Sequence, residues 1–252
     1  MRIVVCIKHV PDVQSERRLE DGRLVRGEED VLNELDENAV EAAVTLAEEA
    51  DGEVIALTMG PEDSEDGVRR ALQMGADSGI VVADDALAGA DVVTTARVLA
   101  AAIERIGEVD LVVTGMASLD AMTSMLPGAL AAALHLPALT LANRLEVDGG
   151  AVTVTRTVGT VREVLSAPLP ALVSVTDQAN EPRYPNFAAM RAAKKKPVDF
   201  WDASELGLEV TEPAVRIIDD EARPAREAGI IRTDAGEAGR ELAAWLVENK
   251  LV

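Results

Sequence analysis

The stretch from residue 114 to residue 128, TGMASLDAMTSMLPG, holds the residues whose types and spacing best suit ligand chemistry. Gly115 permits a tight exit from a strand, and Ser118, Thr123 and Ser124 precede an apolar helix. The free amide hydrogens and the dipole at such a helix start attract a phosphate group. The same hydroxyl residues also suit an ordinary N-cap, so the pattern alone leaves both interpretations open.

Groups of residues for covalent or acid–base catalysis are missing. The only two imidazoles, His9 and His135, have no spacing that pairs them with a metal ligand or a nucleophile. Cys6 lies within an apolar run, which favours a buried small hydrophobe over a reactive thiol. The glycine motifs of nucleotide hydrolases and of dinucleotide folds are also absent from the sequence. The sequence therefore predicts a binding protein with no catalytic residue and no metal site.

Short apolar strands alternate with amphipathic helices in the first half of the chain. The run IVVCI at 3–7 is typical of a strand buried on both faces of a parallel sheet. Further strands are predicted at 54–59, 80–82 and 111–114, and helices at 38–50, 66–74 and 91–106. The alternation predicts an α/β fold with a mostly parallel central sheet and helices on both faces, whose ligands bind beyond the carboxyl ends of the strands.

The second half of the chain has a different pattern. After residue 141 apolar and polar residues alternate around the turn Asp148-Gly149-Gly150, which predicts an antiparallel addition. From about residue 198 the chain is polar until a predicted helix at 235–247. We therefore expect an α/β domain at 1–197, followed at 198–252 by an arm and helix that lie on a partner.

Charge and composition exclude several classes of function. The chain of 252 residues has a formal net charge of −21 and an isoelectric point near 4.4, so it repels nucleic acid. A single cysteine excludes an internal disulfide, and we find neither a secretory segment nor a run of 18 apolar residues. These features predict a cytoplasmic protein.

One segment departs from this acidic character. Residues 180–197, NEPRYPNFAAMRAAKKKP, carry five basic residues and one acidic residue, a local charge of +4. The lysine run at 194–196 suits a solvated helix end and can also meet an acidic partner. Taken alone, Phe187 is expected to pack beneath its own helix.

Motifs along nearly the whole chain resemble the beta subunit of electron-transfer flavoproteins. They are VCIKHVPD at 5–12, LNELDENAVEAA at 32–43, Gly60-Pro61, ALQMGAD at 71–77, VTVTRTVGTVREVLSAPLPALVSV at 152–175 and the basic segment itself. Several motifs in the family's order are far more specific than any one of them.

The resemblance implies an obligate heterodimer with an alpha subunit that holds most of a redox-active FAD, while the beta subunit buries a structural AMP. Carried over by position, the phosphate would sit at Ser124, Met125 and Leu126, and Val13 would face the flavin. The remaining AMP contacts would be Cys6, Asn33, Glu34, Leu35, Asp36, Met59, Gly115, Ser118, Asp120 and Thr123.

The resemblance also makes residues 184–190 a docking loop for flavin dehydrogenases, such as acyl-CoA dehydrogenases. Phe187 would be its apolar anchor, with Tyr184, Met190 and Arg191 beside it. Electrons would then pass to a membrane quinone reductase. Two alternatives stay open: an electron-bifurcating complex in which a second FAD replaces AMP and NADH is the donor, and a stand-alone regulatory protein that binds adenine nucleotides.

Overall fold

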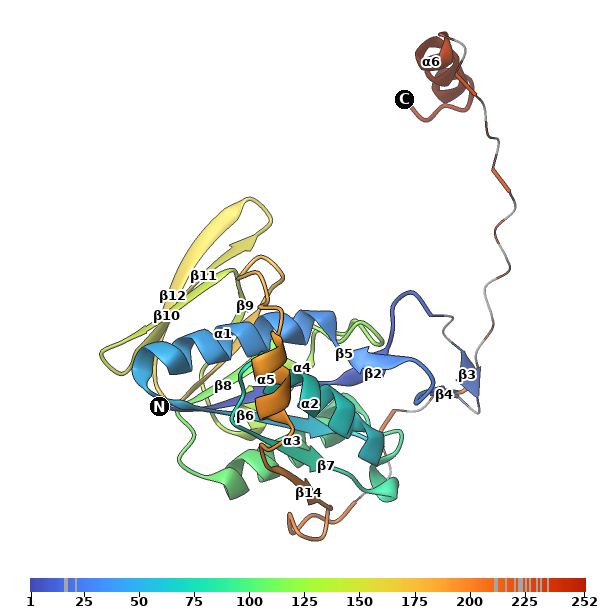
Figure 1. The fold of residues 1–252 in the computed structure, drawn as a ribbon. Helices are drawn as coiled ribbons and strands as arrows, with labels where there is room; N and C mark the ends of the chain where they lie inside the picture. Colours follow the sequence, from blue (N-terminus) through green and yellow to red (C-terminus); the bar gives the residue numbers. More distant parts are fainter. Residues whose placement is uncertain are drawn as a thin grey trace. The chain divides into compact units, whose positions relative to one another are not determined.

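A seven-stranded parallel sheet forms the centre of this computed structural model (Figure 1). The structure describes residues 1–252 except 16, 17, 21, 211, 212, 216, 220, 222, 223, 225, 227, 230, 232 and 235. From one edge to the other, the strands are β14 (Val198–Trp201), β7 (Ser78–Val82), β6 (Glu53–Met59), β1 (Arg2–Cys6), β8 (Leu111–Gly115), β13 (Ala171–Val175) and β9 (Ala138–Ala142). Every neighbouring pair in this order is parallel.

Helices cover both faces of the sheet. One face packs against α1 (Glu34–Ala50) and α2 (Glu65–Met74), and the other against α3 (Val92–Ile106) and α4 (Leu126–Ala133). Successive side chains of β1 alternate between the two cores, because strand residues point to opposite faces in turn: Ile3 and Val5 join the first core, and Val4 and Cys6 the second. The predicted α/β fold with helices on both faces is confirmed.

Smaller antiparallel sheets are added to this frame. Strands β10 (Arg144–Asp148), β11 (Ala151–Val158) and β12 (Val161–Pro168) form one of them. Asp148 faces Ala151 across the turn, whose two residues Gly149 and Gly150 have φ of 57° and 81°, a conformation that glycine adopts without strain. The predicted antiparallel addition is confirmed. Two short ribbons pair β2 (His9–Pro11) with β5 (Asp30–Leu32) and β3 (Leu19–Glu20) with β4 (Arg23–Leu24).

Helix α1 begins four residues before the predicted start at Asn38. The backbone carbonyl of Asn33 accepts from the amides of Asp36 and Glu37, at 2.8 and 3.2 Å, and so opens the helix. Acidic residues in the first turn, Glu34 among them, are favourable at the positive end of the helix dipole. The predicted start lies too far along the chain because this first turn has no apolar periodicity.

The chain continues into the sheet beyond residue 197. Strand β14 pairs with β7 at the sheet edge, and the guanidinium of Arg105 lies 4.7 Å from the ring of Trp201. The segment predicted as an arm from residue 198 therefore begins with a strand of the main sheet. Before it comes the short helix α5 (Phe187–Ala193), which packs against α2.

Two compact units divide the chain, Met1–Asp220 and Glu221–Val252. The second contains α6 (Ala238–Glu248), which has no buried residue and exposes Leu242 and Val247. None of the helices in the described part of the chain combines the length and apolar character needed to cross a membrane.

Candidate functional site

The order of strands in the sheet reverses at β1. Along the chain the sheet grows from β1 through β6 to β7 on one side, and β8 is then placed on the other side of β1. In open α/β sheets, ligands bind beyond the carboxyl ends of the strands at such a reversal. Cys6, Met59 and Gly115 end the three adjacent strands β1, β6 and β8 at this edge.

The start of α1 is tied to the loop that follows β8. The side chain of Asn33 is fully buried and donates from Nδ2 to the carbonyl of Ala117, at 2.9 Å. Its Oδ1 accepts from the amide of Leu119, at 3.0 Å. Asn33 therefore holds the loop after β8 in place with two hydrogen bonds. Its neighbour Glu34 is exposed.

Gly115 lies in close contact with the first turn of α1. A Cβ atom at this position would come within 2.3 Å of Oδ1 of Asp36 and 2.7 Å of the carbonyl oxygen of Leu35. The other carboxyl oxygen of Asp36 accepts from the amide of Lys8, at 2.9 Å. Only glycine allows the end of β8 to approach the helix start this closely.

Two ionisable groups at this edge are held away from their ordinary titration range. Burial raises the pKa of the Asp36 carboxyl to about 7, and hydrogen bonds from its neighbours oppose only part of the rise. Burial, with a smaller contribution from Asp36, raises the pKa of the Cys6 thiol to about 12. Cys6 is therefore a neutral, buried thiol, as its position in the strand predicted.

Asp120 joins two basic residues beside the same loop. The ammonium of Lys8 lies 3.0 and 2.8 Å from its two carboxyl oxygens, and the guanidinium of Arg26 contacts one of them. Burial by itself raises the pKa of Asp120, but Lys8, Arg26 and Ser118 outweigh it and lower the pKa to about 2. The carboxylate is thus ionised, and the cluster of Lys8, Arg26 and Asp120 carries one net positive charge.

Sequence-based reasoning singled out neither basic residue of this cluster. Lys8 entered only as part of the motif at 5–12, and Arg26 carried no signal at all because it lies 94 residues from Asp120 in the chain. Their meeting depends on the ribbon of β2 and β5, which brings the carbonyl of His9 within 3.1 Å of the Arg26 guanidinium.

The start of α4 differs from an ordinary capped helix. Met125 occupies the N-cap position, and no side chain forms a capping hydrogen bond. The exposed residues Thr123 and Ser124 precede it, and Ser124 has a φ of 52°. The interpretation of these hydroxyl residues as N-caps is therefore wrong, and the amides that lead into α4, at Leu126, are left for another acceptor.

An open cavity of about 490 Å³ adjoins this helix start. It lies between α4 and the carboxyl ends of β9 and β13, and three hydroxyl groups line it. The lining residues are Met116, Ser124, Met125, Pro127, Gly128, Ala129, Thr140, Leu141 and Ser174. The cavity can hold a group the size of part of a nucleotide, with hydroxyls available for polar contacts. Val13 does not line this cavity and is exposed in the loop after β2.

The basic segment exposes its aromatic residues. Tyr184 and Phe187 are 87% and 89% exposed, so the expectation that Phe187 packs beneath its own helix is wrong. Asn186 caps α5, its Oδ1 accepting from the amide of Ala189 at 3.0 Å. Met190 is half-buried and Arg191 is exposed on the same short helix.

The fold and the strand order define the class of open α/β proteins whose parallel sheet reverses its strand order at β1. A sequence model of the "Electron transfer flavoprotein domain" matches residues 21–206. "Electron transfer flavoprotein subunit beta" of Mycobacterium leprae is 38% identical over 99% of both chains, and the Bacillus subtilis protein of that name is 31% identical over 98% of this chain and 97% of its own. "Caffeyl-CoA reductase-Etf complex subunit CarD" of Acetobacterium woodii is 31% identical over the full length of both chains. The chain belongs to the electron-transfer flavoprotein family, as a beta subunit.

Proposed function

We propose that this chain and an alpha subunit form an obligate heterodimer that works as an electron carrier in the cytoplasm. It accepts electrons from flavin dehydrogenases, such as acyl-CoA dehydrogenases, and passes them to a membrane quinone reductase. FAD supplies the redox chemistry; the alpha subunit holds most of it, and Val13 of this chain faces it. The chain performs no substrate chemistry of its own.

The exposed pair Tyr184 and Phe187 is the observation that carries this proposal. A carrier must offer a surface to successive partners and release them quickly, whereas an enzyme encloses its substrate. Aromatic side chains often supply the anchor residues of protein interfaces, and exposed apolar patches mark interaction sites.

The residues at the strand reversal fit a structural AMP. The amides that lead into α4 at Ser124, Met125 and Leu126 suit its phosphate, because a helix start without a cap attracts an anion. Lys8 and Arg26 offset the negative charge of the chain at this edge. Gly115 carries no side chain where it approaches α1, so it can meet a ligand only through main-chain groups. This suits a ligand that is bound by main-chain groups.

A second candidate function is an electron-bifurcating beta subunit that binds a second FAD in place of AMP, with NADH as donor. The open cavity beside the start of α4 favours it, since FAD needs more room than AMP. A stand-alone nucleotide-binding regulator fits less well. The exposed apolar residues of α6, Leu242 and Val247 among them, are better explained by a permanent partner.

Replacement of the exposed anchor tests the carrier function. In the heterodimer, Phe187→Ala should lower kcat/KM for reduction by an acyl-CoA dehydrogenase by roughly 30-fold, the effect of losing a hot spot of about 2 kcal/mol. The matched control is Phe200→Ala on the edge strand β14, which should leave the kinetics unchanged. Equal kcat/KM in wild type and Phe187→Ala, at equal flavin content, would remove the docking assignment.

A further inference from the structure

The docking segment lacks a regular backbone where it carries its first aromatic. Residues 180–186 form neither helix nor strand, and the rings of Tyr184 and Phe187 are almost wholly in solvent. Burial of these rings therefore cannot fix the segment in one position. Yet a partner that is met only briefly binds best to a surface that is already ordered. Other contacts must hold the segment in place.

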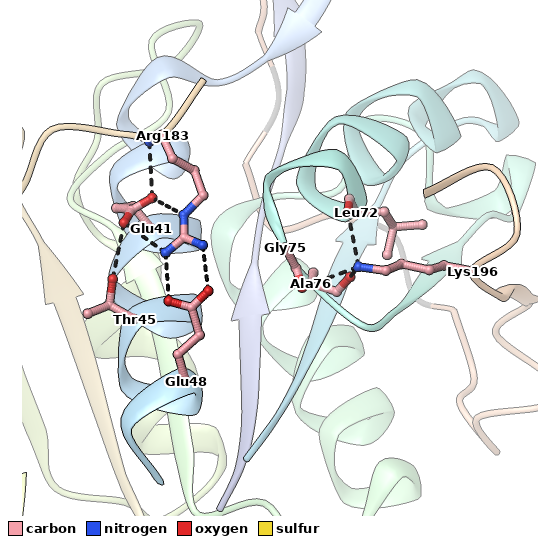
Figure 2. A network of polar contacts seen from close by, with 8 residues as sticks. All are labelled: Glu41, Thr45, Glu48, Leu72, Gly75, Ala76, Arg183 and Lys196. Carbon is pink, nitrogen blue, oxygen red and sulfur yellow. Dashed lines mark hydrogen bonds and ion pairs between the residues drawn. The ribbon is translucent and has the colours of Figure 1, made fainter. Parts of the chain in front are cut away.

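Arg183, next to Tyr184, makes the densest of these contacts (Figure 2). Its Nε and Nη2 donate to the two carboxyl oxygens of Glu41, at 2.8 and 3.1 Å. Its Nη1 and Nη2 donate to the two carboxyl oxygens of Glu48, at 2.6 and 3.1 Å. The backbone amide of Arg183 also donates to Glu41, at 3.0 Å. One planar guanidinium thus forms two hydrogen bonds to each of two carboxylates. Lysine cannot reproduce this bidentate geometry.

Helix α1 presents these carboxylates on one stripe. Glu41 and Glu48 are two turns apart, so their side chains lie above one another on the same face. Thr45, between them, donates its hydroxyl to Glu41 at 3.1 Å. The side chain of Glu41 is only 13% exposed, which separates this cluster from ordinary surface ion pairs of little effect. The pKa of Glu41 is lowered because Arg183 outweighs the effect of burial, and Arg183 is the main cause that lowers the pKa of Glu48. Both carboxylates are ionised at neutral pH.

Two further contacts hold the chain on either side of Arg183, so Arg183 has to position only the residues between them. Upstream, the side chains of Asn38 and Asn180 exchange hydrogen bonds with each other's backbone carbonyls, at 3.0 and 2.9 Å. Downstream, the ammonium of Lys196 donates to the carbonyls of Leu72, Gly75 and Ala76 at the end of α2 (Figure 2). Between these fixed points, Arg183 is the residue that immediately precedes the first exposed aromatic.

We infer that Arg183 is a positioning residue for partner docking: by gripping Glu41 and Glu48 of α1, it holds Tyr184 and Phe187 where a partner meets them. This inference rests on the proposed docking function of the segment. The α/β core does not need the contact, because seven apolar residues of α1 are buried in the core. Loss of Arg183 should therefore leave the side chains of Tyr184 and Phe187 without a fixed position, while the fold stays intact.

Kinetics of the heterodimer with an acyl-CoA dehydrogenase test the inference. Arg183→Met should raise KM for the carrier about tenfold, while kcat, flavin content and Tm stay unchanged, because only pre-organisation is lost. Backbone amides of residues 180–190 should exchange hydrogen faster. Arg183→Lys, which keeps the charge and loses the fork, should recover only part of the loss. The matched control is Arg97→Met, an exposed arginine of α3 on the opposite face of the sheet.

Glu41→Gln separates a shared contact from two independent effects. It should raise KM in the same direction, and the double variant with Arg183→Met should be no worse than Arg183→Met alone. Additive effects would overturn the inference.

The Phe187→Ala variant distinguishes failure of the inference from failure of the docking function. If Phe187→Ala raises KM and Arg183→Met does not, the docking function stands and the positioning inference is wrong. If neither variant changes KM, the docking function itself fails, and the inference with it. A parallel fall of kcat, flavin content and Tm in Arg183→Met would make Arg183 a residue of the fold and would also overturn the inference.

Discussion

Adding a methyl group at residue 115 should push apart the end of β8 and the start of α1. The new Cβ atom of Gly115→Ala would come within 2.3 Å of the Asp36 carboxylate and 2.7 Å of the Leu35 carbonyl oxygen. Neither atom can yield cheaply, since one is backbone and the other belongs to a buried side chain that accepts from the Lys8 amide. Relief of both contacts requires a shift of the first turn of α1.

The expected cost follows from these two contacts. Overpacking of a well-filled site destabilises a protein by about 1–3 kcal/mol. At roughly 2–4 °C per kcal/mol for a chain of this size, Tm should fall by roughly 2–12 °C. Because the shifted turn borders the proposed nucleotide site, Gly115→Ala should also retain less AMP, and Gly115→Val less still.

Thermal unfolding of the heterodimer at one fixed protein concentration measures the first effect, since Tm of a complex depends on concentration. The control is Gly128→Ala in α4, where a Cβ atom would meet nothing within 4 Å, so Tm should hold or rise. A Gly115→Ala heterodimer with the Tm and AMP content of the wild type would show that the turn yields freely, and would refute the reasoning.

Three further predictions concern charge and assembly. The folded pKa of Asp36 is raised to about 7, so the folded state holds a proton that the unfolded state has lost, and the contribution of Asp36 to stability falls as pH rises from about 4 to about 7. Asp36→Asn should flatten that dependence in thermal unfolding at pH 4, 5.5 and 7.5, and an unchanged slope would contradict it. The pKa of Asp120 is lowered to about 2, so its contribution is present above pH 4 and is lost as pH falls through 2. Asp120→Asn should cost roughly 1–3 kcal/mol in denaturant unfolding at pH 7, because Lys8 and Arg26 lose a partner, and an unaltered midpoint would argue against it. Removal of residues 221–252 should leave the sheet folded and abolish copurification with the alpha subunit; a truncated chain that still copurifies would exclude the arm from assembly.

The fold was predictable where local pattern and burial agree. The run at 3–7 predicted a strand buried on both faces, and β1 does alternate between two cores. The pattern failed where an element has little periodicity of its own. The acidic first turn of α1 is held by the carbonyl of Asn33, and β14 is an edge strand whose pairing with β7 spans more than 100 residues.

The candidate site was predictable only at the ends of strands. The resemblance named Cys6, Met59 and Gly115, and the parallel strands that the pattern predicted bring them to one edge, because the carboxyl ends of such strands meet there. The N-cap interpretation of Thr123 and Ser124 failed, since Met125 takes the cap position instead. Which of these residues contact a nucleotide stays a prediction.

The sequence pattern contains no signal for contacts between distant parts of the chain. Arg183 lies 142 residues from Glu41, and no local pattern links two such positions. The exposure of Phe187 followed only from the family resemblance, because the local pattern taken alone predicts that an isolated aromatic beside a short helix packs against it.

Counting the nucleotides bound to the purified heterodimer tests the proposed function most directly. The chain is co-expressed with its alpha subunit, the complex is denatured, and the released nucleotides are measured by chromatography against protein. The proposed electron carrier should release about one FAD and about one AMP per heterodimer. Two FAD and no AMP would favour the bifurcating alternative, and a chain that brings down neither alpha subunit nor flavin would contradict the electron-carrier function.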